Sequence, residues 1–216
     1  IFNLEGISSL NLDADTLAQI FTGEITNWND AAIASQNAGV DFPDLSITAV
    51  HRSDESGTTA NFTDYMSKAS TDFWLLAGEN AGSFEAWPAE WGGEGAPQTS
   101  GVVDAVTNGT GTIGYADASR AGSLGTVSVK VGSEYVPYSA EAAAKIVDAS
   151  PAANPGERGD NDLAIELDRA TEASGTYPIV LVSYLIGCND YADDSVVDLV
   201  KGYVSYVVSE EGQLAA

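Results

Sequence analysis

The sequence is poor in the residues on which several kinds of protein chemistry depend. Its 216 residues contain one cysteine, one histidine and one methionine. Because Cys188 stands alone, the chain cannot form an internal disulfide framework. With His51 as the single histidine, zinc-type clusters are excluded and any metal site would have to consist of carboxylates. We therefore expect neither a metal site nor a cofactor.

Basic residues are also scarce. Eight Lys and Arg stand against 32 Asp and Glu, which leaves a formal net charge of −24. Nucleic acids and anionic membrane surfaces both bind Lys and Arg, so neither is an expected partner. Long apolar runs are missing, since none approaches the ~20 residues of a membrane-spanning helix. The 44% of apolar residues, with 9% aromatics, nevertheless excludes intrinsic disorder.

Helical and strand patterns alternate along the chain, which predicts an α/β fold. The predicted helices cover residues 13–22, a short stretch from Asp30, 102–108, 140–147, 163–171 and 195–209. The predicted strands cover 45–50, 111–116, 127–131, 135–138 and 177–186, and loops are expected at 82–101 and 151–162. Residues 177–186 are nearly all apolar, which is typical of a strand buried on both faces.

A strand, a polar turn and a helix follow one another over residues 45–66. The start of a helix carries unpaired backbone N–H groups and a partial positive charge. Gly57 would let a ligand approach the backbone closely, because it has no Cβ. Ser56, Thr58 and Thr59 would add hydroxyl donors. This pattern favours a site for a dehydrated tetrahedral oxyanion.

Arg52 precedes this turn and can supply a planar fork of donors, with Asp54 able to pair with it and fix its orientation. Helix capping is an equally ordinary role for Ser-Gly-Thr at a helix start, so both interpretations stay open here. The lysine of a nucleotide-binding Walker loop is missing. Ser56 would need His51 as a base to act as a nucleophile, and no flanking motif supports that pair.

Other candidates have simpler explanations. Trp87 and Trp91 could stack on a sugar, but they more simply pack the loop in which they lie. Cys188 is expected to be a small buried apolar residue.

Residues 51–59 (His-Arg-Ser-Asp-Glu-Ser-Gly-Thr-Thr) resemble the R-x-D-x-S-G-T signature of the phosphate-binding proteins of high-affinity phosphate ABC transporters. The similarity runs along nearly the whole chain, and four further segments match in order: 17–30, 111–118, 176–184 and 207–213.

The resemblance implies a two-lobed, venus-flytrap fold of the periplasmic-binding-protein type II class, with phosphate held between the lobes. Residues 1–174 would form the second lobe, and residues 175–216 would return into an incomplete first lobe. The expectation is then that an N-terminal segment of the same protein is missing from this chain. That segment would supply further contacts, including an acidic residue that accepts the proton of hydrogen phosphate and so rejects sulfate.

By the same resemblance, Arg52, Ser56, Gly57 and Thr58 would contact phosphate, and Asp54 would be the aspartate that pairs with the arginine. Glu55 stands where many family members have glycine, and its side chain is expected to point to solvent.

The implied function is that of an extracytoplasmic substrate-binding protein that captures inorganic phosphate and delivers it to an ABC transporter permease in the membrane, and not that of an enzyme. It would act in the periplasm or at the cell surface, lipid-anchored in the full-length protein. The alternatives are a phosphatase-type or other hydrolytic enzyme that uses Ser56, and a surface protein that keeps the fold without a transport role.

Overall fold

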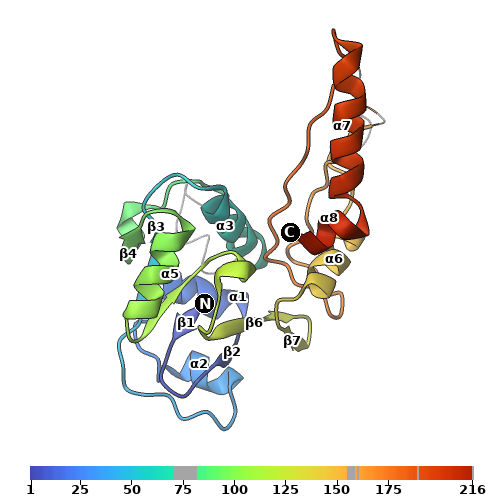
Figure 1. Ribbon diagram of the computed structural model, residues 1–216. Helices are drawn as coiled ribbons and strands as arrows, with labels where there is room; N and C mark the ends of the chain where they lie inside the picture. The colour runs from blue at the N-terminus through green and yellow to red at the C-terminus, as the bar shows by residue number, and fades with distance from the viewer. Residues whose placement is uncertain (71–81, 155–158, 160, 189, 216) are drawn as a thin grey trace. The chain divides into compact units, whose positions relative to one another are not determined.

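A computed structural model describes residues 1–70, 82–154, 159, 161–188 and 190–215. The chain divides into two compact units, Ile1–Leu181 and Val182–Ala216 (Figure 1). We describe each unit by itself.

The larger sheet of the first unit has the strand order β1-β5-β3-β4. Its strands are β1 (Phe2–Asn3), β5 (Thr112–Gly114), β3 (Thr48–Arg52) and β4 (Glu94–Ala96). β3 pairs in parallel with both β5 and β4, whereas β1 is antiparallel to β5. The strand predicted at 45–50 is therefore confirmed with both of its ends shifted towards the C-terminus, and Arg52 is the last residue of an interior strand.

A smaller sheet contains β2 (Ser9–Leu12), β6 (Thr126–Val131) and β7 (Glu134–Val136), in the order β2-β6-β7. β2 and β6 are parallel, and β6 and β7 form an antiparallel hairpin. The turn of this hairpin lies at residues 132–133, as the sequence predicts.

Helices begin and end where local signals place them. The helices of the first unit are α1 (Ala14–Thr22), α2 (Ala31–Gln36), α3 (Gly57–Ala69), α5 (Gln98–Asn108) and α6 (Ala140–Ala149), with short 3-10 turns η2 (Ala89–Trp91) and η3 (Ala118–Arg120). Asp13 caps α1 by accepting the N–H of Thr16, and Gly23 ends that helix with a left-handed φ of 83°. Such caps satisfy the backbone groups that a helix end leaves unpaired.

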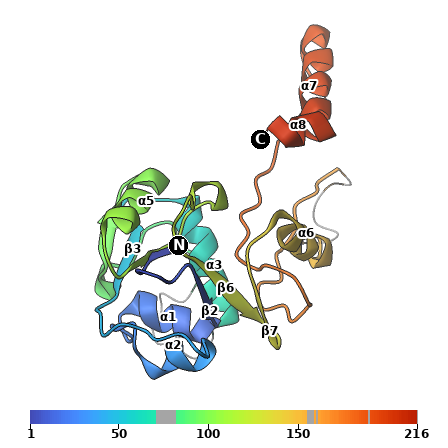
Figure 2. The ribbon, with the colours of Figure 1, turned by 60° about the horizontal axis from the view of Figure 1, so that its bottom comes forward.

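Two hydrophobic clusters pack against the larger sheet, whose strands and helices are shown in Figures 1 and 2. On one face, Val50 packs with Val102 and Val106 of α5. On the other, Phe21 of α1 and Phe62 of α3 meet edge to face, with ring centroids 4.8 Å apart. Because side chains alternate along a strand, Arg52 shares the α5 face with Val50, and His51 lies on the face of α1 and α3.

Three sequence predictions are wrong in whole or in part. Residues 163–171 form no helix, and 177–186 form no strand. No strand in the described part of the chain pairs with 177–186, and Leu185 and Ile186 are exposed. Apolar composition alone does not make a strand, because a strand also needs neighbouring backbone partners. The loop expected at 82–101 contains η2, β4 and the start of α5.

The second unit consists of an irregular segment followed by α7 (Asp194–Val207) and α8 (Glu210–Ala215). The helix predicted at 195–209 is confirmed, and its apolar side chains Leu199 and Tyr203 are exposed. Cys188 is exposed too, so its predicted burial is wrong; none of the residues described in this unit is part of a buried core. Within the described ranges, no helix is long and apolar enough to cross a membrane.

Candidate functional site

The turn between β3 and α3 lies at the carboxyl end of an interior parallel strand. β3 ends at Arg52 and α3 starts at Gly57. Ser56 is the N-cap of the helix, and its Oγ accepts the backbone N–H of Thr58 at 3.1 Å. Ligands of open α/β sheets gather at this edge, where strand ends and helix starts meet.

Asp54 holds the guanidinium of Arg52 in a two-pronged ion pair. Nε of Arg52 donates to Oδ1 at 2.8 Å, and Nη2 donates to Oδ2 at 2.5 Å. The backbone N–H of Gln98, at the start of α5, donates to Oδ1 at 2.9 Å. These donors lower the pKa of Asp54, the Arg52 hydrogen bond most of all, and the same bond raises the pKa of Arg52. The predicted pairing of the two residues is confirmed.

Several donors of this turn have no acceptor among the residues that the structure describes. They are Nη1 of Arg52 and the backbone N–H groups of Gly57 and Thr59, whereas Ala60 N already bonds Ser56 O at 3.0 Å. The side chain of Arg52 is only 11% exposed. A Cβ on Gly57 would meet no atom within 4 Å, so the space beside the helix start is open. Such a cluster of donors is suited to an oxyanion.

One sequence expectation for this turn needs correction. Thr59 is fully buried and its Oγ1 lies 2.8 Å from the hydroxyl of Tyr115, so this hydroxyl is not a ligand donor. His51 stacks on Trp87, with ring centroids 5.0 Å apart, and its Nδ1 lies 2.9 Å from Arg52 O. This engagement disfavours His51 as a base for Ser56. Glu55 is exposed, as expected.

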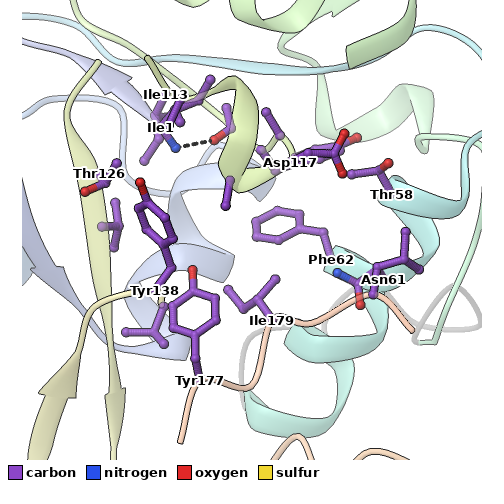
Figure 3. Close-up of a pocket in the computed structure, with 18 of the residues that line it drawn as sticks. Ile1, Thr58, Asn61, Phe62, Ile113, Asp117, Thr126, Tyr138, Tyr177 and Ile179 are labelled. Atoms are coloured by element: carbon purple, nitrogen blue, oxygen red, sulfur yellow. Dashed lines mark hydrogen bonds between the residues drawn. The ribbon is translucent and has the colours of Figure 1, made fainter. Parts of the chain in front are cut away.

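The predicted site residues do not all line one cavity. Thr58 lines a cavity of about 310 Å³ together with Asn61, Phe62, Asp117 and the two tyrosines Tyr138 and Tyr177 (Figure 3). Arg52 and Asp54 line a different cavity of about 370 Å³, together with Trp87. Ser56 is buried and Gly57 is exposed between these two regions of the turn. The candidate oxyanion position is therefore the open turn itself, and neither cavity alone.

The family model of the PBP superfamily domain matches residues 1–211 of this chain. The chain belongs to the PBP superfamily.

Curated relatives of this PBP domain carry the name phosphate-binding protein. PstS3 of Mycobacterium bovis is 36% identical over 214 residues, which cover 96% of this chain and 55% of the relative. PstS 2 of Mycobacterium tuberculosis is 32% identical with the same coverage. PstS of Xylella fastidiosa is 44% identical over 123 residues, 56% of this chain and 32% of the relative. The chain thus spans about half the length of the first two relatives, and the resemblance found from its motifs is confirmed.

Solved structures of similar fold cover nearly all of the PBP domain. One is a high-affinity periplasmic phosphate-binding protein (PfluDING) bound with phosphate, with a TM-score of 0.64 and 24% identity, over 99% of this chain and 62% of that chain. Another is a human phosphate binding apolipoprotein, with a TM-score of 0.60 and 22% identity, over 99% and 63%. At these identities the likeness shows the fold alone, and the expected α/β fold of type II binding proteins is confirmed.

Two residues of this PBP domain support the turn but are not predicted from the sequence. Gln98 acts through its backbone N–H, with a left-handed φ of 58° that only the folded chain reveals. Tyr115 lies directly after β5, in the matching segment 111–118, and its hydroxyl accepts the N–H of Arg52 at 3.0 Å. A tyrosine at the carboxyl end of a strand next to β3 is the signal that could have identified it.

The ionised state of Asp54 sets one pH prediction. Its folded-state pKa lies below the ordinary value, so the stabilisation that it gives is present above ~3.9 and is lost only as the pH falls through the lowered folded-state pKa. We expect the Arg52–Asp54 pair to remain intact throughout the pH range ~4–8. Carbon-detected NMR of the Asp54 carboxyl should give a midpoint below the ordinary value. In an Arg52→Ala variant the midpoint should rise; an unchanged midpoint there would contradict the assignment of the cause.

Proposed function

We propose that this chain is part of an extracytoplasmic substrate-binding protein that captures inorganic phosphate and delivers it to an ABC transporter permease in the membrane. One observation carries the proposal: a guanidinium held by a carboxylate lies beside a helix start whose first N–H groups have no acceptor among the described residues. The names of the relatives support phosphate as the anion. In this proposal the protein acts in the periplasm or at the cell surface, held there by a lipid anchor.

In the proposed complex, Arg52 donates from Nη1 and Gly57 from its backbone N–H. The hydroxyls of Ser56 and Thr58 add donors, since an oxygen that accepts a capping bond can still donate its proton. Asp54 stays ionised and keeps the guanidinium in place. A net charge of −24 does not prevent this binding, because distant exposed charges are screened over ~8–10 Å.

The two-lobed arrangement is inferred from the resemblance to the phosphate-binding proteins. Residues 1–174 are proposed to form the second lobe and 175–216 to return into the first, with phosphate enclosed as the lobes close. A segment of the same protein outside this sequence is proposed to supply the opposite wall of the cleft.

Calorimetric titration of the complete protein tests the proposal. We expect saturable binding of phosphate and arsenate, with sulfate bound much more weakly, because a dry site rejects ligands that leave its polar groups unpaired. Absence of phosphate binding would contradict the proposal and favour a surface protein that keeps only the fold. Turnover of a chromogenic phosphate ester would instead point to a hydrolase. The stacking of His51 on Trp87 and its contact with Arg52 O argue against a hydrolase that uses Ser56, because His51 is the base that Ser56 would need.

Gly57→Ala separates ligand access from folding. The added methyl would meet open space in the protein, so we expect the free energy of unfolding to stay within ~1 kcal/mol of the original. The same methyl would occupy space beside the proposed anion and should weaken phosphate binding roughly tenfold or more. Gly202→Ala, on α7 and also facing open space, is the matched control and should leave affinity unchanged. Equal affinities of the two variants would place phosphate elsewhere.

A further inference from the structure

We propose that Tyr115 is a positioning residue of the phosphate site, whose hydroxyl fixes both ends of the segment 52–59. This inference rests on the proposed function and assigns a residue that contacts the segment from a neighbouring strand.

One phenol oxygen joins the two ends of that segment. The hydroxyl of Tyr115 accepts the backbone N–H of Arg52 at 3.0 Å and lies 2.8 Å from Oγ1 of Thr59. Arg52 is the last residue of β3, and Thr59 lies in the first turn of α3. Every residue that the sequence predicts to contact phosphate lies between these two contacts or at one of them.

The ring of Tyr115 has a fixed place in the core. It stacks on Phe62 of α3 with centroids 4.7 Å apart and planes at 23°, and it lies 6.1 Å from Phe21 of α1. Tyr115 is 7% exposed and Thr59 is fully buried, so water has little access to the two hydrogen bonds. Burial raises the pKa of Tyr115, which keeps its hydroxyl neutral and able both to donate and to accept.

Removing this oxygen would leave the partly buried Arg52 N–H and the buried Thr59 hydroxyl without their common partner. Buried polar groups left unpaired are costly, and the segment can recover them only by moving. Such a movement would shift the Arg52 guanidinium relative to the N–H groups of the α3 start. Binding by several directed hydrogen bonds is sensitive to shifts of this kind.

Tyr115→Phe in the complete protein keeps the ring and removes only the oxygen. We expect phosphate affinity to fall roughly tenfold, which corresponds to the free energy of about one hydrogen bond. Thr59→Val should weaken binding similarly, and Thr59→Ser, which retains the hydroxyl, should restore it. The double variant Tyr115→Phe with Thr59→Val should bind little worse than Tyr115→Phe alone, because the contact that Thr59→Val removes is already lost in Tyr115→Phe.

Tyr65→Phe is the matched control. Tyr65 lies on α3 and is fully buried, and its hydroxyl has no hydrogen-bond partner among the residues described. Loss of that oxygen should leave phosphate affinity unchanged. If Tyr115→Phe binds phosphate as tightly as the original protein, or no more weakly than Tyr65→Phe, the positioning role is overturned while the proposed function stands.

Hydrogen exchange of the Arg52 amide provides a readout that needs no phosphate. We expect exchange at this amide to accelerate in Tyr115→Phe and to stay unchanged in Tyr65→Phe. If the original protein fails to bind phosphate, the proposed function is wrong, and the positioning role for phosphate falls with it; faster exchange would then still identify Tyr115 as the support of Arg52. Unchanged exchange would overturn that structural role as well.

Discussion

Replacing Arg52 with alanine should reduce the phosphate affinity of the complete protein by roughly 30- to 5000-fold. This range follows from the loss of ~2–5 kcal/mol that accompanies removal of one partner of an enclosed, hydrogen-bonded charge pair, here the guanidinium and the bound anion. Two consequences of the substitution act together. The Nη1 donor disappears, and Asp54 becomes an uncompensated negative charge beside an anion. Isothermal titration calorimetry at fixed ionic strength measures the effect.

Two further variants make this result specific. Arg120→Ala removes another arginine, one that is exposed on η3, and should leave affinity nearly unchanged. Arg52→Lys keeps the charge but cannot form the two-pronged contact with Asp54, so it should recover only part of the binding. If Arg52→Ala and Arg120→Ala lose the same affinity, the effect is one of net charge and the assignment of Arg52 to the site fails.

Arg169→Met should destabilise the first unit by about 3–5 kcal/mol, the usual cost of breaking a buried ion pair on one side. Arg169 is 7% exposed. Its Nε donates to Asp64 Oδ2 at 2.5 Å and its Nη2 to Asn61 Oδ1 at 2.7 Å, both on α3. Its Nη1 donates to the backbone oxygens of Pro178, at 2.8 Å, and Val180, at 3.3 Å. Methionine fills similar volume but satisfies none of these acceptors.

Urea unfolding followed by circular dichroism measures this loss of stability. The control is Lys68→Met, which removes a half-exposed cation 3.3 Å from the same Asp64. Exposed pairs contribute ~0–1 kcal/mol, so this variant should unfold almost as the original does. Similar midpoints for the two variants would mean that Arg169 does not hold the segment 178–180 against α3.

The candidate site was accessible from sequence because its parts are contiguous. Arg52, Asp54 and Ser56 lie in one turn, and the ion pair and the helix cap depend on neighbours only a few residues away. The starts of α1 and α2 were predictable for the same reason, since each cap is a single aspartate next to its helix.

Long-range contacts set the limit of such prediction. Tyr115 contacts the turn from the end of a neighbouring strand, and Gln98 contacts it from the start of a separate helix. The residue pattern of the turn itself therefore does not predict either contact. β4 contains Gly95 and lacks β-branched residues; it forms because its backbone pairs with β3, opposite His51. The apolar run at 177–186 shows the converse case. Its composition favours a strand, but a strand needs partners that the described part of the chain does not provide.

Ser53 and Glu55 are both exposed, although they sit among residues that are pinned to the sheet and to α3. Redesign of specificity can therefore proceed at these two positions without disturbing the framework beneath them. A library that varies the charge at positions 53 and 55 would change the electrostatic potential at the rim of the turn while Asp54, Ser56 and Tyr115 keep its geometry. In the proposed phosphate site, the exposed positions could thus be varied separately from the structural ones, and the turn would be a starting point for sensors of other small oxyanions.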